Sequence, residues 1–408
     1  MPARPARDKA RPTIERPKVF RQPKAVLVSA TVVSAAAAML FNLMPALLAA
    51  VAVRFGLSDG QIGAVGSSYL MGFAIVACTS NLWIDRFNWR HIVASAAAVS
   101  VTALAACAIV NSLWALLAVL TIVGCGLGSL YTVCTAVVSE NHRPDQAFGI
   151  KLAGEVALAI VALFILTTFV IDRWGFSGVV MTFSGITALA ALYGLRGLPV
   201  GREFTPPEKR FAMARRDGET SPILRDWAPW LGLSALFVSF AGVAALWAFV
   251  SQLAPTFGVS TEEADGVLTT ALIVSGVAGV AAAFLGDRVG RATPLAFGMA
   301  LAIAGVATLG LGKGLSAYFI GVVLAGGCWN FPLAYQMGMI ASADGRGNVA
   351  VLMPAAIAVG GALGPVIAGS LIATANGYMP LYAFFAVAAT VGLAAFVVLG
   401  RRLASGER

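Results

Sequence analysis

Long uncharged stretches of apolar residues alternate with short polar segments along the chain. Asp, Glu, Lys and Arg are absent from residues 25–53, 60–84, 92–139, 174–195, 227–261, 266–286, 292–312, 314–343 and 347–400. Each stretch reaches the roughly 20 residues that a helix needs to cross a bilayer. Two of them are long enough for two helices and are interrupted by turn residues at Asn111-Ser112 and Asn376-Gly377. With one further helix expected at 146–171, the pattern predicts twelve transmembrane helices.

The charges of the connecting segments predict the orientation of these helices. If the N-terminus is cytoplasmic, only Arg54, Arg173 and Lys313 of the 28 Lys and Arg residues lie outside. Because cytoplasmic loops of membrane proteins are enriched in Lys and Arg, both termini are expected on the cytoplasmic side of a bacterial inner membrane. The net charge of +9 therefore reflects topology, and nucleic acid is not an expected partner. The apolar content of 59% makes membrane lipid the expected surroundings.

Two polar segments divide the chain into domains. Residues 1–24 hold eight Lys or Arg and five Pro, which predicts a disordered cytoplasmic tail. A signal peptide is the alternative, but the apolar run that follows is longer than a signal core of about 7 to 15 residues. Residues 196–226 are expected to form a cytoplasmic linker between six-helix bundles at 25–195 and 227–401, with a short cytoplasmic tail at 402–408.

An internal repeat relates the two predicted bundles. Phe55-Gly56-Leu57-Ser58 recurs as Phe257-Gly258-Val259-Ser260, and Asp85-Arg86 recurs as Asp287-Arg288, both at an offset of 202 residues. Each pair of landmarks brackets the second helix of a half. Parallel repeats of this kind are typical of secondary transporters.

The loop after the second helix resembles a motif of the major facilitator superfamily, G-x-x-x-D-R-x-G-R-R. The second half has Asp287-Arg288-Val289-Gly290-Arg291, while the first half keeps Asp85-Arg86 and Arg90 but has Asn81 and Asn88 in place of the two glycines. The resemblance extends over residues 25–402. It implies an all-α integral membrane fold of twelve transmembrane helices in two pseudo-symmetric six-helix bundles.

The same resemblance implies a secondary active transporter that moves a small organic solute by alternating access. Protons are the expected coupling ion, as in symport, and a drug or metabolite efflux antiporter of the same fold is the alternative. An integral-membrane enzyme or a channel is less favoured, because no clustered catalytic groups, metal-binding pattern or filter segment is visible. No catalytic residue, metal or cofactor is expected, and the protein is expected to be a monomer.

Charged residues of the inner loops are candidates for a gate that holds the bundles together. Carboxylates and arginines in such loops can pair when the inner side is closed. The alternative is that they only fix topology. The candidates are Asp85, Arg86, Asp287 and Arg288, with Glu140, Arg143, Asp344 and Arg346 as their expected partners.

Polar and aromatic residues within the predicted spans are candidates for the substrate site. The resemblance implies that helices one, four, seven and ten surround the cavity, and polar groups in spans tend to face a cavity or another helix. The candidates are Asn42, Tyr131, Thr135, Trp247, Gln252, Trp329, Asn330, Tyr335 and Gln336. These four helices hold no deep Lys or Arg, so a neutral, weakly acidic or amphipathic substrate is expected. For each aromatic residue, helix packing is the alternative.

Glu155 is the one carboxylate that falls clearly within a predicted span. If its helix begins near Ala147, Glu155 lies roughly 12 Å along the helix axis. Removal from water favours the protonated form of a carboxyl group, so Glu155 is the candidate proton-coupling residue, together with Lys151 one turn earlier. The alternatives are a solvated helix end and a structural ion pair with Lys151.

Overall fold

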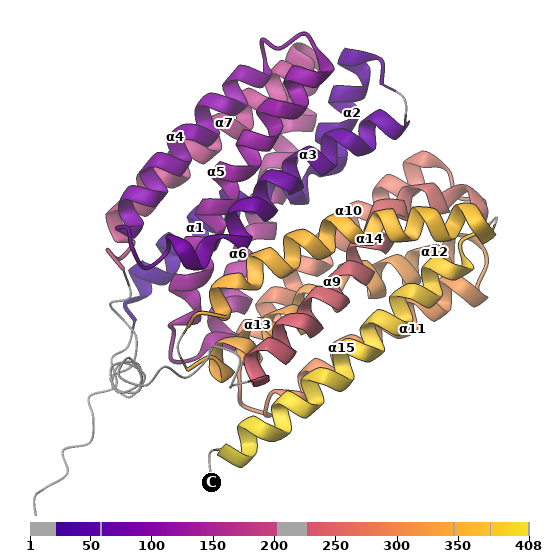
Figure 1. Ribbon diagram of the computed structural model, residues 1–408. Helices are drawn as coiled ribbons and strands as arrows, with labels where there is room; N and C mark the ends of the chain where they lie inside the picture. Colours follow the sequence, from indigo (N-terminus) through magenta and orange to yellow (C-terminus); the bar gives the residue numbers. More distant parts are fainter. Residues whose placement is uncertain (1–21, 58, 202–226, 346, 376, 407–408) are drawn as a thin grey trace, which may run out of the picture.

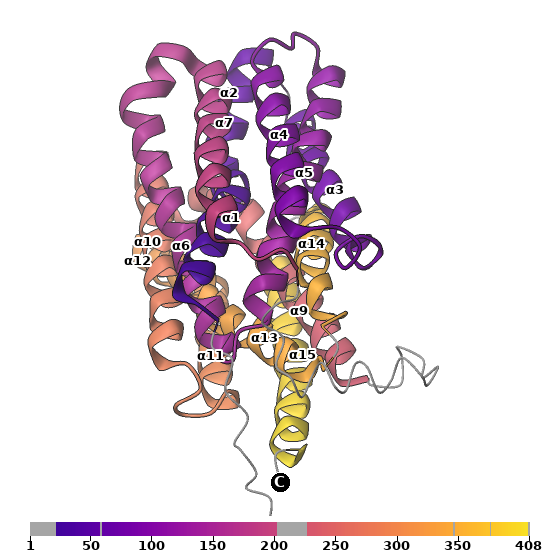
Figure 2. The ribbon, with the colours of Figure 1, turned by 90° about the vertical axis from the view of Figure 1, so that its left-hand side faces the viewer.

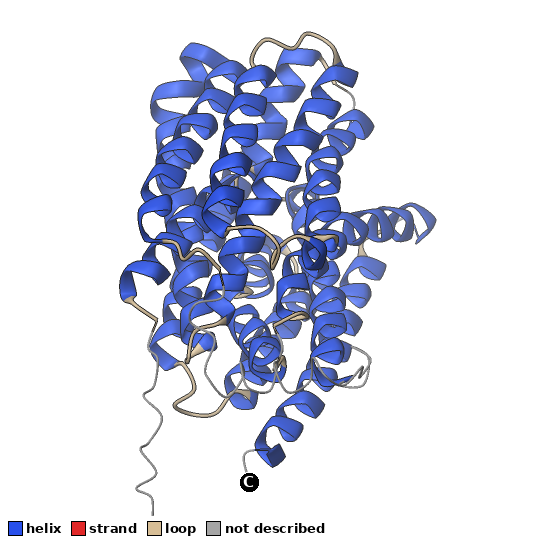
Figure 3. Cartoon of the chain, turned by 60° about the vertical axis from the view of Figure 1, so that its left-hand side comes forward, coloured by secondary structure: helices blue, strands red, loops and turns tan. Residues whose placement is uncertain are grey.

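The structure is a computed structural model that describes residues 22–57, 59–201, 227–345, 347–375 and 377–406. Most of the predicted tail at 1–24 and of the predicted linker at 196–226 lies outside these residues. The described elements are helices, as Figure 3 shows, and the predicted all-α membrane fold is confirmed.

The first half begins with a span that is interrupted near its middle, at Leu43. The helices of this half are α1 (Lys24–Asn42), α2 (Met44–Phe55), α3 (Asp59–Cys78), α4 (Trp89–Cys107), α5 (Leu113–Ser139), α6 (Pro144–Ile165), the π-helix η2 (Leu166–Val170) and α7 (Ile171–Gly197), with a short 3-10 turn η1 (Ser80–Leu82) after α3.

The second half has the same order of spans. Its helices are α9 (Trp227–Leu253), α10 (Thr261–Leu285), α11 (Ala292–Leu311), α12 (Gly314–Val322), the π-helix η5 (Val323–Gly327), α13 (Asn330–Ala343), α14 (Met353–Ala375) and α15 (Met379–Gly406), with 3-10 turns η4 (Ala254–Phe257) and η6 (Ala350–Leu352). α12, η5 and α13 together form one irregular span. The adjacent Gly326 and Gly327 allow the backbone to depart from the α-helix there.

The number of spans agrees with the prediction of twelve. Eleven segments of the described chain are long and apolar enough to cross a bilayer, and one of them covers Pro144–Gly197. A straight helix of these 54 residues would measure roughly 81 Å, far more than one membrane thickness. The backbone turns at Gly175, where φ is 51° and ψ is −139°, so this segment supplies two spans.

The internal repeat is visible in the backbone. Gly56 ends α2 with φ of 60°, and Gly258 follows η4 with φ of 68°, so both repeated glycines adopt the left-handed conformation that favours this residue. The repeated segments Phe55-Gly56-Leu57 and Phe257-Gly258-Val259 therefore form equivalent turns in the two halves.

The two halves contact each other mainly through α6 and α3. α6 packs against α10 and α13, and α3 packs against α14. Figures 1 and 2 show the first half in indigo to pink and the second half in salmon to yellow, with the described ends of α1 and α15 on the same side. We call this the terminal side of the molecule, and the opposite one the far side.

Small residues let α6 and α10 approach closely. A methyl group added at Gly149 would lie 2.6 Å from the backbone nitrogen of Ala283, and one at Gly279 would lie 2.9 Å from that of Ala153. Each glycine on one helix therefore faces an alanine on the other. This arrangement brings the two backbones into near contact at the junction of the halves.

Candidate functional site

A cavity lies between the two halves, and the empty space along its lining, including the part open to solvent, is about 580 Å³. The first half lines it with Ala38, Phe41, Asn42, Tyr69, Leu70, Phe73, Tyr131, Leu152, Glu155 and Val156, and the second half with Phe240, Trp329, Asn330, Leu333, Ile357 and Ala358. Two smaller cavities, of about 410 and 420 Å³, share Phe240 and Trp329 with it. The three cavities therefore adjoin one central region of the molecule.

Aromatic rings form much of the wall of this region. The ring of Phe41 lies 6.1 Å from that of Phe240, across the boundary between the halves. Phe240 lies 5.4 Å from Trp329, and Phe73 lies 5.6 Å from Tyr131. Such spacing is typical of interacting rings, and it leaves flat apolar faces that can contact a flat organic molecule.

Two buried polar atoms of residues that line the first of these cavities have no hydrogen-bond partner among the described residues. They are Oη of Tyr69, on α3, and Oδ1 of Asn330, on α13. Tyr69 is 1% exposed and Asn330 is 2% exposed, so neither side chain is open to bulk water. Because a buried polar atom usually has a hydrogen-bond partner, a ligand with hydrogen-bonding groups would supply the missing partners of both atoms. The two atoms belong to opposite halves, so one ligand could bridge the halves.

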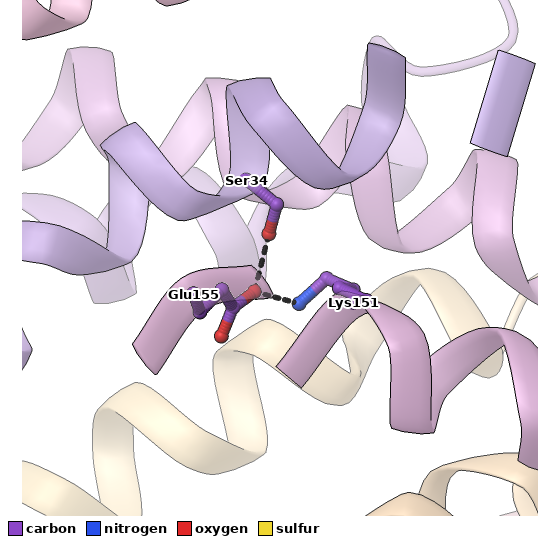
Figure 4. A network of polar contacts seen from close by, with 3 residues as sticks. All are labelled: Ser34, Lys151 and Glu155. Carbon is purple, nitrogen blue, oxygen red and sulfur yellow. Dashed lines mark hydrogen bonds and ion pairs between the residues drawn. The ribbon is translucent and has the colours of Figure 1, made fainter. Parts of the chain in front are cut away.

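A charged network lies beside this wall (Figure 4). Nζ of Lys151 donates to Oε1 of Glu155 at 2.5 Å, and Oγ of Ser34, on α1, donates to the same oxygen at 2.5 Å. Glu155 and Lys151 are one helical turn apart on α6, which places them on the same face of the helix. Nζ of Lys151 also lies 3.7 Å from the centre of the Tyr131 ring, within cation–π distance.

Lys151 and Glu155 differ in their access to the cavity. Lys151 is fully buried, whereas Glu155, at 4% exposed, contributes to the lining. Glu155 is the only Asp, Glu, Lys or Arg among the described residues that line the three cavities. In this ion pair, Glu155 therefore faces the cavity, and Lys151 is buried behind it.

Most of the predicted substrate residues lie in these walls. Asn42, Tyr131, Trp329 and Asn330 line the first cavity, while Trp247 and Gln336 line the other two. The remaining three lie outside all three linings. Thr135 and Tyr335 are fully buried, and Gln252 is exposed near the end of α9, where its carbonyl oxygen accepts a hydrogen bond from Tyr378.

Several lining residues were not among the sequence candidates. They are the aromatic residues Phe41, Tyr69, Phe73 and Phe240. Tyr69 carries the only tyrosine hydroxyl in α3, and a polar aromatic residue within an apolar span is a signal that could have identified it. The three phenylalanines carry no such signal, because an apolar ring is equally suited to a cavity, a helix contact or lipid.

The halves are also joined by a charge pair on the terminal side. Nε of Arg291, in the loop after α10, donates to Oδ2 of Asp145 at 2.8 Å, near the start of α6. Asp145 is 2% exposed and Arg291 is 22% exposed by side chain. Gly338 of α13 lies against this aspartate, since a methyl group there would be 2.8 Å from its Cα. Nearby, Oγ of Ser80 donates to the carbonyl oxygen of Val351 at 3.4 Å, again between the halves.

The predicted gate residues differ in their environments. Asp85, Arg86, Arg143, Asp287 and Arg288 are exposed. Glu140 is buried, and buried Asp344 accepts hydrogen bonds from the backbone nitrogens of Val349 and Ala350, so it caps the turn before α14. Arg346 lies outside the described residues. Asp145 and Arg291 were not among the predicted gate residues, although Arg291 ends the motif copy of the second half.

Comparison with known proteins identifies related sequences. A family model described as Major Facilitator Superfamily matches residues 27–236. A gentisate transporter of Corynebacterium glutamicum is 26% identical over 377 residues, which cover 86% of this chain and 82% of the relative. A Bacillus subtilis protein with a proposed role in niacin or nicotinamide transport is 24% identical over 388 residues, which cover 91% of this chain and 94% of the relative.

Solved structures share the fold. The transporter FucP in an outward conformation matches with a TM-score of 0.72 at 17% identity, covering 95% of this chain and 99% of FucP. The human organic anion transporter MFSD10 matches with a TM-score of 0.70 at 17% identity, covering 94% of this chain and 100% of MFSD10.

Proposed function

This chain belongs to the major facilitator superfamily, as a transporter of small organic solutes, and we propose that its substrate is a small aromatic acid that it moves by alternating access together with protons. The proposal concerns the substrate class, the coupling ion and the residues of the site. The protein is a multi-pass membrane protein and not an enzyme.

The observation that carries the substrate class is the combination of aromatic walls with two unpaired polar atoms. Tyr69 Oη can donate to a substrate oxygen, and Asn330 Oδ1 can accept from a substrate hydroxyl or N–H group. The rings of Phe41, Phe240 and Trp329 provide apolar surface between the halves. An aromatic ring with small polar substituents suits these groups, and the names of the two relatives include such molecules, gentisate and niacin.

Glu155 is the proposed proton-binding residue. It is a carboxylate in the cavity wall, within a transmembrane helix, and its pairing with Lys151 and Ser34 ties α6 to α1. A change of its protonation would alter this contact, which is a route from proton binding to helix movement.

The proposed gate on the terminal side includes Asp145 and Arg291 with the neighbouring motif residues. Under the predicted orientation, with both termini in the cytoplasm, this pair closes the inner side. The substrate would then reach the cavity from the far side in this conformation, and separation of the pair would accompany opening to the cytoplasm. Efflux in exchange for protons is the alternative direction of transport through the same site.

A binding screen tests the substrate class. Purified full-length protein in detergent would be heated with gentisate, niacin, nicotinamide, fucose or xylose, because a ligand that binds the folded state raises the apparent melting temperature. We expect the aromatic compounds to stabilise the protein and the sugars to leave it unchanged. Counterflow of the bound compound in proteoliposomes would then establish carrier activity. Stabilisation by sugars alone would overturn the proposed class.

A further inference from the structure

We propose that Lys151 is the anion-binding group of the transport site, and that Glu155 and the carboxylate of the substrate alternate as its counter-ion. This inference rests on the proposed function, and it adds a stoichiometry. One proton would move with one monoanion, and no net charge would cross the membrane.

Lys151 does not line the cavity itself, but the side chains that it contacts do. Its ammonium group is covered by the Glu155 carboxylate at 2.5 Å and by the Tyr131 ring at 3.7 Å, and both of these residues line the cavity. Lysine has a flexible four-carbon stem with three donors, so its ammonium group can move toward the cavity when a covering group leaves. Glu155 is the covering group whose hold on Lys151 depends on a proton.

The second oxygen of Glu155 supports this role. Ser34 and Lys151 both donate to Oε1, and Figure 4 shows the other carboxylate oxygen pointing away from both donors. Neither of these hydrogen bonds involves that oxygen, and Glu155 belongs to the cavity wall. A proton can therefore reach this oxygen from the cavity without first breaking the ion pair.

Charge neutrality then sets the stoichiometry. Lys151 and Glu155 together carry no net charge, and the described walls of the three cavities contain no further Asp, Glu, Lys or Arg. A monoanion that entered this site alone would leave an uncompensated negative charge in a region of low dielectric constant. A proton on Glu155 removes one negative charge, so that Lys151 and the substrate carboxylate become the new neutral pair.

The step is balanced in protons and charge. A proton from water on the open side binds the free oxygen of Glu155, the neutral carboxyl group releases Lys151, and the substrate carboxylate accepts from Nζ. After the site opens to the other side, the substrate leaves, the proton returns to water and Glu155 pairs with Lys151 again. Lys151 keeps its proton throughout, and no covalent bond forms or breaks apart from the O–H bond of Glu155.

Among the described residues around Glu155, no second carboxylate competes with it for a proton. Tyr131 and Cys134 of α5 and Tyr69 of α3 interact with it electrostatically, and α1 contributes Ser34. Two helices of the second half, α10 and α13, pack on α6. The titratable residue of α13 is Tyr335, whose charged neighbours are Asp145 and Asp287. The described acids of α10 lie at the start of that helix, where they are exposed. The π-helix η2, which follows the end of α6, holds no titratable side chain.

If Lys151 binds the substrate carboxylate, an aromatic acid and its amide should differ in the pH dependence of binding and in accumulation. Niacin and nicotinamide have the same ring, but only niacin carries a carboxylate for Lys151. We expect niacin to bind more tightly as pH falls and to be accumulated by a pH gradient. Nicotinamide should bind against the same aromatic walls, independently of pH, and should only equilibrate.

Transport in proteoliposomes tests the stoichiometry. Uptake of labelled niacin and gentisate would be driven by a pH gradient alone or by a potassium diffusion potential alone. We expect accumulation with the pH gradient, and no change of the initial rate with the potential. Uptake that the potential accelerates, or that no pH gradient drives, would overturn the inference while leaving the substrate class intact. Failure of both acids and of nicotinamide to bind or exchange would overturn the proposed function as well.

Variants test the role of the two residues. Glu155→Gln fixes the neutral state, so carboxylate affinity should become independent of pH, exchange should persist and accumulation should be lost. Lys151→Gln alone would leave a buried carboxylate without a counter-ion and risks failing to fold. The double variant K151Q/E155Q avoids this, and it should lose at least about tenfold in niacin affinity while keeping nicotinamide affinity.

The matched control is Lys313→Gln, which removes an exposed lysine directly before α12. Lys313 lies at the far-side end of the span that α12, η5 and α13 form, and α13 is at the other end of this span. We expect its niacin affinity and its transport to equal those of the unmodified protein. Folding of every variant would be checked by its elution as a single species and by its melting temperature without ligand. A folded double variant that binds niacin as tightly as the unmodified protein would overturn the role of Lys151.

Discussion

Asp145 of the first half and Arg291 of the second half form an ion pair 146 positions apart in the sequence, with 2.8 Å between Oδ2 and Nε. The pair lies on the terminal side, where Ser80 also contacts the backbone of Val351 across the halves. Both contacts join the first half to the second half on this side. The structure is therefore in a conformation whose terminal side is closed.

The first prediction concerns this pair. Asp145→Asn removes the charge that Arg291 contacts, so the closed conformation should lose roughly 1–3 kcal/mol, between the values for exposed and buried pairs. The population should shift toward opening on the terminal side. Reaction of a cysteine introduced at Ser80 with a thiol reagent from that side would measure the shift as a faster rate.

Asp287→Asn is the matched control, because it removes an exposed acid four residues before Arg291. If the motif acid is itself part of the gate, as the sequence indicates, the two variants will open the terminal side equally. If closure depends on the buried pair, Asp145→Asn will have the larger effect. An unchanged rate in Asp145→Asn would remove this pair from the gate.

The second prediction concerns the contact between α6 and α10. Gly149→Ala places a methyl group 2.6 Å from the backbone nitrogen of Ala283, so the two helices must separate. Overpacking of this kind typically costs about 1–3 kcal/mol. We expect a lower melting temperature and slower substrate exchange. Gly185→Ala on α7 is the control, since no atom lies within 4 Å of the added methyl group, and it should be neutral or slightly stabilising.

The third prediction tests the orientation of the chain. In intact cells, a cysteine at Lys313, which is exposed on the far side, should react with a membrane-impermeant thiol reagent. A cysteine at Arg401, exposed near the end of α15, should react only after permeabilisation. The unmodified protein must be labelled in parallel because it has free cysteines, including the exposed Cys78. The opposite pattern would reverse the predicted topology.

The sequence predicted the parts of this protein that depend on local composition. Uncharged stretches indicated the spans, and the paired motifs Asp85-Arg86 and Asp287-Arg288 indicated the repeat. Glu155 and Lys151 stood out because charges within a span are costly unless they are paired or functional. These signals need no knowledge of which helices are neighbours.

The parts that depend on distant contacts were not predictable in the same way. Asp145 looks like an ordinary acidic residue in the first turn of a helix, and its partner is known only once α6 and the loop after α10 are brought together. The resemblance implied a cavity between helices one, four, seven and ten, which hold no deep Lys or Arg, so Lys151 on the fifth helix was predicted to act in proton coupling alone. The structure places its ammonium group against Tyr131, which belongs to one of those four helices.

The last prediction concerns Tyr69. Tyr69→Phe removes a hydroxyl group that has no partner among the described residues, so the free energy of unfolding should stay the same or rise slightly. If Oη binds the substrate, affinity should fall by about 2- to 13-fold, which corresponds to a hydrogen bond of about 0.5–1.5 kcal/mol. Niacin titration and thermal unfolding without ligand would measure the two effects separately.

Tyr318→Phe gives the opposite expectation and serves as the control. Its Oη donates to the carbonyl oxygen of Val250 at 3.0 Å, and Tyr318 is fully buried outside the linings of the three cavities. Loss of this hydroxyl removes a buried hydrogen bond, so stability should fall by about 0.5–1.5 kcal/mol while niacin affinity stays constant. If Tyr69→Phe behaves like Tyr318→Phe, with lower stability and unchanged affinity, Tyr69 is a packing residue and its hydroxyl does not contact the substrate.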